Sequence, residues 1–86
     1  MFVHIGENIV IPEGSIIAII DIESVNTSDD TKQFLKIAEE EGFVERITED
    51  EPKSFILAEI DKKSIVYLSP ISSITLCKRS CFIDTL

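Results

Sequence analysis

Five basic side chains in the last part of the sequence carry the chemistry best suited to binding a ligand. They are Lys53, Lys62, Lys63, Lys78 and Arg79. Lysine and arginine contact the phosphates of nucleic acids, and Lys62 and Lys63 fall between two predicted strands, where a hairpin tip exposes them. With so few cations in one chain, useful affinity requires several subunits to contribute phosphate contacts together. These residues are therefore candidates for nucleic-acid binding, and ordinary solubilising lysines are the alternative.

Cysteine and histidine, the usual ligands of zinc, are too few here to predict a metal site. Cys77 and Cys81 stand four residues apart, which places two thiols on one face of a helix, and His4 is the only histidine. A zinc site takes three or four ligands, and the second ligand pair of a zinc motif is missing. We therefore expect no metal and no cofactor, and we expect both cysteines to be reduced thiols.

Groupings of residues that would support catalysis are not found in the sequence. Ser69, Ser72 and Ser73 cluster, but their expected roles are turn formation and helix capping. The acidic runs 39–41 and 49–51 fall at exposed ends, where we expect solvated carboxylates rather than a tuned acid–base pair. The three glycines are isolated from one another, which excludes a glycine-rich phosphate loop. The sequence thus predicts a protein that is not an enzyme.

Charge is divided unevenly along the chain, whose net charge is −8. Residues 1–51 carry thirteen acids and three bases, whereas residues 52–86 carry three acids and five bases. The negative total opposes nonspecific DNA binding, but a local basic patch can still bind when the acids lie on another face. No aromatic stacking platform accompanies the bases, which makes binding of single-stranded nucleic acid the less favoured mode.

Hydrophobic residues make up 44% of the chain, and many of them are isoleucines in dense runs such as 16–20. This is more apolar surface than one small core can hide, which predicts association with other copies or with a protein partner. A well-packed monomer with a fully buried central strand is the alternative. The sequence shows no secretory signal and no apolar run of membrane-spanning length, so we expect a cytoplasmic protein without membrane contact.

Two helices are expected to position some of these residues. The main helix should span about 28–41, with Thr27 as its capping residue. A short C-terminal helix should begin at Ser72 or Ser73 and end with Arg79, whose positive charge suits the end of a helix.

The remaining elements are strands, predicted over residues 2–5, 8–11, 16–23, 43–48, 54–60 and 64–69. Residues 16, 18, 20 and 22 should share one face of their strand, and residues 24–26 should form a connector. The sequence therefore predicts an α+β fold. Residues 1–86 should form a small single domain, with a mostly antiparallel sheet of about five or six strands, one main helix and a short C-terminal helix. The apolar tail 81–86 is expected to be a docking segment.

Three patches of the sequence resemble a known family of proteins. The first consists of residues 2–6 with 8–10, and the second is the strand 16–20 together with the connector and helix after it. The third and longest consists of residues 65–76 with Lys78-Arg79. In order and combined length they resemble the extracellular matrix regulatory proteins of spore-forming bacteria, RemA and RemB, with RemB the more similar of the two.

This resemblance implies a small α+β domain that forms a ring-like or stacked homo-oligomer and acts in transcription of biofilm-matrix genes. In RemA-like members, basic residues just before the strand that corresponds to 54–60 are implicated in DNA contact. Here that stretch reads Glu49-Asp50-Glu51-Pro52-Lys53, so only Lys53 keeps the positive charge. The first hypothesis is a homo-oligomeric regulator that binds double-stranded DNA through basic residues of several subunits. The second is an oligomeric protein-interaction module without nucleic-acid affinity.

Overall fold

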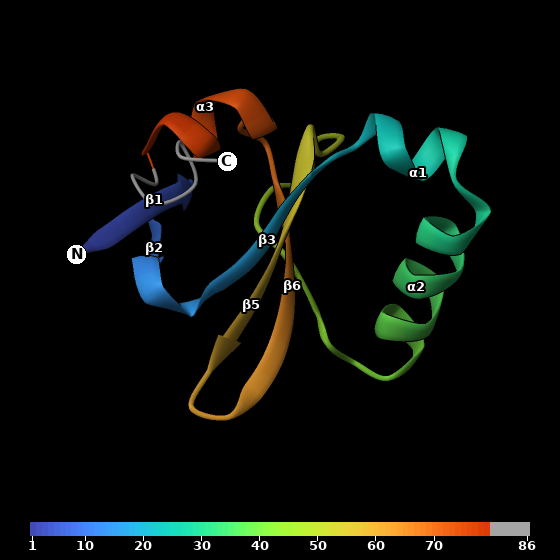
Figure 1. Ribbon diagram of the computed structural model, residues 1–86, viewed down its shortest axis with the longest axis horizontal. Coiled ribbons are helices and arrows are strands. Elements are labelled where there is room, and N and C mark those ends of the chain that lie inside the picture. Colours follow the sequence, from blue (N-terminus) through green and yellow to red (C-terminus); the bar gives the residue numbers. More distant parts are fainter. Residues whose placement is uncertain (80–86) are drawn as a thin grey trace.

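Residues 1–79, which the computed structural model describes, form six strands and three α-helices (Figure 1). The strands are β1 (Phe2–Gly6), β2 (Ile9–Pro12), β3 (Ile16–Asp21), β4 (Val44–Arg46), β5 (Ser54–Ile60) and β6 (Lys63–Ser69). The helices are α1 (Glu23–Thr27), α2 (Asp29–Glu40) and α3 (Ser73–Arg79), and a short 3-10 helix, η1 (Glu13–Ser15), precedes β3. The α+β fold class expected from the sequence is confirmed.

These strands divide into two sheets. β1 and β2 form an antiparallel hairpin, and the other four strands lie in the order β3-β5-β6-β4. β3 and β6 both run antiparallel to β5, whereas β4 runs parallel to β6. The strand pairing is therefore mostly antiparallel, as predicted, although the six strands of the described chain form two sheets rather than one.

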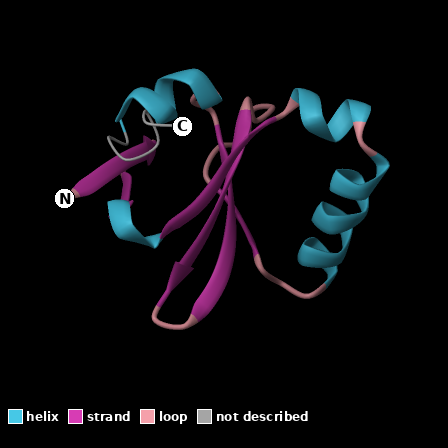
Figure 2. Cartoon of the chain, in the orientation of Figure 1, coloured by secondary structure: helices cyan, strands magenta, loops and turns pink. Residues whose placement is uncertain are grey.

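The four-stranded sheet lies between two covering layers. α1 and α2 cover one face, and the β1–β2 hairpin together with α3 covers the other (Figures 1 and 2). Successive side chains of a strand point to opposite faces, so in β5 Phe55 packs on the α2 side and Ile56 packs on the hairpin side. Both side chains are fully buried. β5 is therefore an inner strand with apolar cover on both faces.

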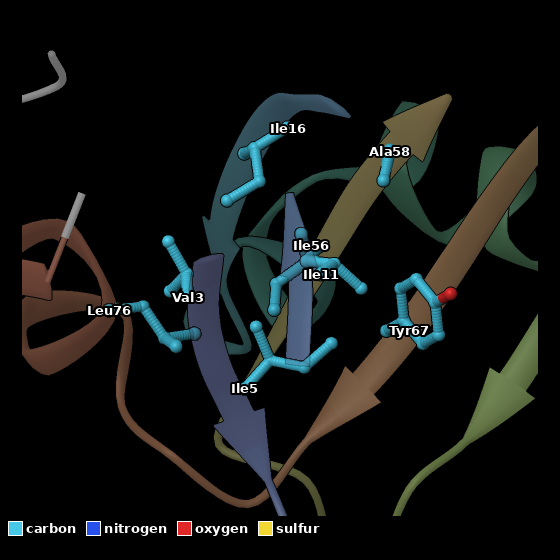
Figure 3. Packing of buried hydrophobic residues seen from close by; sticks show 8 residues of the cluster. All are labelled: Val3, Ile5, Ile11, Ile16, Ile56, Ala58, Tyr67 and Leu76. Carbon is cyan, nitrogen blue, oxygen red and sulfur yellow. The ribbon is translucent and has the colours of Figure 1, made fainter. Parts of the chain in front are cut away.

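The larger cluster of buried side chains joins the hairpin and α3 to the sheet (Figure 3). Its members are Val3, Ile5, Ile11, Ile16, Ile56, Ala58, Tyr67 and Leu76. The second cluster lies under α2 and consists of Ala38, Phe55, Val66 and Leu68. Because removing apolar surface from water is the dominant favourable term in folding, these two clusters hold the covering layers against the sheet.

β3 is an edge strand of the four-stranded sheet and contains a β-bulge. Its register shifts between Ile16 and Ala18, so Ile16 packs on the hairpin side while Ile20 packs on the α2 side. The prediction that residues 16, 18, 20 and 22 share one face is wrong, because a bulge inserts one residue and reverses the alternation. At the bulge, Ile17 is 57% exposed.

Residues 24–26, expected as a connector, belong to helix α1. The capping residue of α2 is Ser28 rather than Thr27, since the Thr31 N–H donates to Ser28 Oγ at 3.3 Å. Serine and threonine are both good N-cap residues, so residue type alone does not show which of the two caps the helix.

Among the helices of residues 1–79, none is long and apolar enough to cross a membrane.

The end of β6 fixes the hairpin to the four-stranded sheet. Ser69 is completely buried, and its hydroxyl donates to the Ile5 carbonyl at 2.6 Å and accepts the Ile71 N–H at 3.0 Å. Nearby, Gly6 has a φ of 138°, and a Cβ at this position would lie 2.8 Å from Cδ of Pro70. Only glycine fits such a close approach with a positive φ. The close contact between Gly6 and Pro70 therefore holds β1 against the segment that leads into α3.

Candidate nucleic-acid interface

Lys62 and Lys63 lie at the tight turn that joins β5 to β6. Ile60 pairs with Lys63, which leaves Asp61 and Lys62 as the two turn residues, with φ values of 52° and 68°. A two-residue hairpin turn with positive φ at both positions matches the twist of the flanking strands. Both lysine side chains are exposed at this tip, where an extended ligand has access to them.

Lys78 and Arg79 form the last turn of α3. Ser72 begins this helix, because its Oγ accepts the Thr75 N–H at 3.3 Å. Arg79 is exposed but anchored, since its Nη1 donates to the His4 carbonyl at 2.9 Å and lies 3.4 Å from His4 Nδ1. Arg79 thus joins α3 to β1. The guanidinium group has five N–H donors, and those that do not contact His4 can donate to a ligand.

Lys53 immediately precedes β5, and neighbouring elements hold its backbone on both sides. Its N–H donates to the Ser69 carbonyl at 2.8 Å, and its carbonyl accepts the Ile22 N–H at 3.2 Å. The side chain is exposed. The position of Lys53 is therefore well defined, but the acidic residues 49–51 lie just before it in the chain.

The five candidate cations form three separate groups on one copy of the chain. Lys53 and Lys62 lie at opposite ends of β5, whose seven residues span about 20 Å. Lys78 and Arg79 lie on α3, in the layer on the hairpin side of the sheet (Figure 1). A single copy does not gather all five into one continuous patch.

A hollow of about 490 Å³ lies beside the acidic turn that precedes Lys53 in the chain, and three of the residues that line it are acidic. It is lined by Ile22, Asn26, Arg46, Glu49, Asp50, Glu51 and Pro52. Thr48 shapes the acidic turn, because its Oγ1 accepts the Asp50 N–H at 3.2 Å. Arg46 is not among the cations selected from the sequence. A single basic residue at the end of a predicted strand is too weak a signal to separate it from a solvated strand end.

A second hollow, of about 690 Å³, lies against the β5–β6 turn. It is lined by Gly42, Phe43, Glu45, Lys62, Lys63, Ser64 and Ile65. The lysines therefore share this surface with the carboxylate of Glu45, and the hollow is not purely basic.

Tyr67 lies beside this region, paired with Glu45 across β4 and β6. Its ring belongs to the larger core cluster, and its hydroxyl points away from Ile56 and Ile11 (Figure 3). Burial, and to a lesser extent the negative charge of Glu45, raises the pKa of Tyr67 above its ordinary value of 10.0. The phenol is therefore neutral at physiological pH and adds no charge to the site.

Metal-ligating residues do not come together in the part of the chain that the structure describes. Within residues 1–79, no three His, Cys, Asp or Glu side chains lie close enough to hold one metal ion. Cys77 is a free thiol of intermediate burial on α3. His4 lies at the protein surface with Nε2 2.6 Å from the Glu7 carbonyl oxygen. Cys81 and the expected docking segment 81–86 lie outside the described residues.

Comparison with known families gives a match over almost all of the described chain. The family model named RemA-like, described as extracellular matrix regulatory protein A-like, matches residues 2–79. These residues include every strand and helix described above and all five candidate cations. No curated protein matches the chain significantly. The closer resemblance to RemB that the sequence indicates stays a prediction.

Proposed function

The chain belongs to the RemA-like family of extracellular matrix regulatory proteins, and from this membership we propose that it is a homo-oligomeric, DNA-binding regulator of extracellular matrix genes. The observation that carries the proposal is the length of the match, which extends from β1 to the end of α3. The family is regulatory, so the proposal includes no enzymatic activity. A cytoplasmic location, as expected from the sequence, is part of the proposal because DNA lies there.

Self-association is supported by large apolar side chains that one copy of the fold leaves exposed. They are Met1, Phe2, Val10, Ile17, Phe34, Ile37, Phe43 and Ile74, with exposed fractions from 41% to 85%. Phe34, Ile37 and Phe43 line one groove, and contiguous exposed apolar surface on a soluble protein marks interaction sites. A second copy of the chain is the partner most consistent with the family resemblance and with the apolar excess.

DNA binding is supported by the exposure of the five cations, at positions that a symmetric assembly would repeat. Each copy has a net charge of −8, so the mean field of the protein repels DNA. An assembly that repeats one basic group along a rim accumulates phosphate contacts and gains affinity through multivalency. The β5–β6 turn is the best candidate for that rim, because it places two adjacent lysines at an exposed tip.

Fluorescence anisotropy with a labelled matrix-gene promoter fragment tests this proposal. We expect the double variant Lys62→Glu/Lys63→Glu to bind at least about tenfold more weakly, because each subunit loses two phosphate-binding charges and gains two repulsive ones. The matched control is Lys32→Glu/Lys36→Glu, which makes the same charge change on the exposed surface of α2. Equal losses in the two variants, or no binding by the unaltered protein, would contradict the proposed contact.

An oligomeric protein-interaction module without nucleic-acid affinity is the second candidate function. The acidic hollow lined by residues 49–51 favours it, because these carboxylates lie immediately before Lys53 and repel phosphate. Under this candidate, the triple variant Glu49→Gln/Asp50→Asn/Glu51→Gln leaves promoter affinity at zero. Under the DNA-binding proposal, the same variant raises promoter affinity, because it removes repulsion near Lys53.

A further inference from the structure

An apolar groove lies between α2 and the four-stranded sheet, and nothing in residues 1–79 covers it. This groove, called the α2 groove below, has a volume of about 320 Å³ and is lined chiefly by Phe34, Ile37, Ala38, Phe43, Leu57 and Val66. Phe34 is 41% exposed, and Ile37 and Phe43 are each 49% exposed. Its size is at the lower end of the range for pockets that bind small ligands or a few side chains. The groove therefore has room for two or three apolar side chains.

One segment of the chain has the composition that the α2 groove accepts. Residues 82–86 read Phe-Ile-Asp-Thr-Leu, three apolar side chains with a single acid. The α2 groove adjoins the hollow at the β5–β6 turn, since Phe43 and Ser64 line both. Lys62 and Lys63 line that hollow together with Glu45. Apolar anchors in the α2 groove would place Asp84 close to these two lysines, which gives charge complementarity as well as apolar contact.

The short length of chain after α3 argues against the α2 groove of the same copy as the binding site. Arg79 ends α3 on the hairpin side of the sheet, where it is anchored to His4. Helix α2, which borders the α2 groove, covers the other face (Figure 1). The four residues from Arg79 to Ile83 span at most about 14 Å when fully extended. The route must cross from one covering layer to the other around the sheet, and packed layers are each about 10 Å apart. This length of chain favours a neighbouring copy as the one whose α2 groove accepts Phe82 and Ile83.

We propose that the C-terminal segment 82–86 of one copy docks in the α2 groove of a second copy, with Phe82 and Ile83 as apolar anchors. This inference rests on the self-association proposed above and names the contact that produces it. The end of α3, from which the segment continues, and the α2 groove lie on different faces of each copy, so the proposed contact is heterologous. Repetition of a heterologous contact closes into a ring when the rotation between copies permits it. Each copy then donates one segment and accepts another.

Disulfide cross-linking of the full chain tests this contact. The native Cys81 lies next to Phe82, and Ile37→Cys places a thiol at the exposed rim of the α2 groove, with Cys77→Ser removing the other native thiol. Because a disulfide requires Cα atoms within about 7 Å, we expect oxidation to link two or more chains through Cys81, as seen on a non-reducing gel. The matched controls are Lys32→Cys, which is exposed on α2 away from the α2 groove, and Ile37→Cys with Cys81→Ser. A species cross-linked within one chain, or no link beyond these controls, would overturn the inference.

Light scattering distinguishes failure of this contact from failure of self-association. We expect Phe82→Ser to raise the dissociation constant of the assembly by about tenfold or more, because one buried aromatic anchor is lost from each contact. Thr85→Ser is the control in the same segment and should leave assembly unchanged. If the unaltered protein assembles and Phe82→Ser assembles equally well, the docking of the segment is refuted and self-association still stands. A monomeric unaltered protein refutes both.

Discussion

Lys62 combines a candidate phosphate contact with an unfavourable backbone conformation. Its φ of 68° follows a φ of 52° at Asp61, and a side chain other than glycine in the left-handed region costs about 1–2 kcal/mol. Aspartate tolerates this region comparatively well, whereas a long unbranched side chain gains nothing from it. The strain at Lys62 is therefore consistent with selection of this residue for its charge at the tip rather than for its fit to the turn.

Replacing Lys62 with glycine separates these two roles. We expect Lys62→Gly to raise the free energy of unfolding by about 0.5–1 kcal/mol, because Asp-Gly is a favoured pair for this turn and the strain is relieved. The same variant should bind promoter DNA more weakly. The matched control is Lys63→Gly in β6, which removes the same charge but should lower stability by about 0.5–1 kcal/mol, as glycine does inside a strand. Urea denaturation measures the free energy of unfolding of both variants. A change of the same sign in the two variants would show that the turn is not strained.

Tyr67 makes stability depend on pH in the alkaline range. Its pKa is raised in the folded protein, mainly by burial and also by Glu45, so the folded state holds the phenolic proton more tightly than the unfolded chain does. The resulting stabilisation is complete below the unfolded pKa of about 10 and is lost as pH rises through the higher folded pKa.

We therefore expect the free energy of unfolding to fall as pH rises above about 10, more steeply than in the Tyr67→Phe variant. Urea denaturation across this range measures the difference. At pH 7 the variant should differ by less than about 1 kcal/mol, because it conserves shape. Parallel curves for the two proteins above pH 10 would contradict the assignment to Tyr67.

At the scale of elements, one buried hydroxyl adds a polar contact to the apolar cluster that attaches the hairpin to the sheet. Ser69 Oγ donates to Ile5 in β1 and accepts from Ile71 ahead of α3. We expect Ser69→Ala to lower the free energy of unfolding by about 1–3 kcal/mol, because it leaves buried polar groups without partners. Ser64→Ala, in the same strand but exposed, is the control and should change it by less than about 0.5 kcal/mol. Equal effects in urea denaturation would show that the hydroxyl contributes nothing specific.

Several elements were predictable because their sequence patterns depend on local chemistry. β5 and the β5–β6 turn follow from the apolar run 55–58 and from the polar residues 61–63 between two strand-like segments, although Lys63 belongs to β6 rather than to the turn. The span of α2 follows from its helical apolar spacing and its serine or threonine cap. The division of the strands into two sheets, by contrast, depends on pairing between distant residues, such as the contact of Ser69 with Ile5.

Other features of the fold left no clear local signal. The bulge at Ile16–Ala18 results from pairing with β5, and a continuous isoleucine run reads equally well in either register. Helix α1 is one short turn that a sequence window cannot distinguish from a connector. Of the candidate site, the identity and exposure of the five cations follow from the sequence. The sequence also separates Lys53 from Lys62 and Lys63, since it predicts the strand between them, but it does not show that α3 carries Lys78 and Arg79 on the hairpin side of the sheet.

For the whole molecule, separated cations and exposed apolar side chains lead to the same expectation. One copy presents three small basic groups and an α2 groove that residues 1–79 leave uncovered, so we expect a stable DNA contact and full apolar burial only in an assembly. We expect multi-angle light scattering at tens of micromolar protein to give a mass of several subunits. A mass near the 9.6 kDa of one chain would contradict the assembly.

The central claim, DNA binding by several subunits together, is tested most directly by the salt dependence of promoter binding. Anisotropy titrations at a series of salt concentrations give the slope of log affinity against log salt, which reports the number of phosphates neutralised. If all five candidate cations of one chain contacted phosphates, the slope would be about −4.5. We predict a steeper slope, because subunits of one assembly add their contacts. A slope that one chain can account for, or no measurable binding at low salt, would contradict the account.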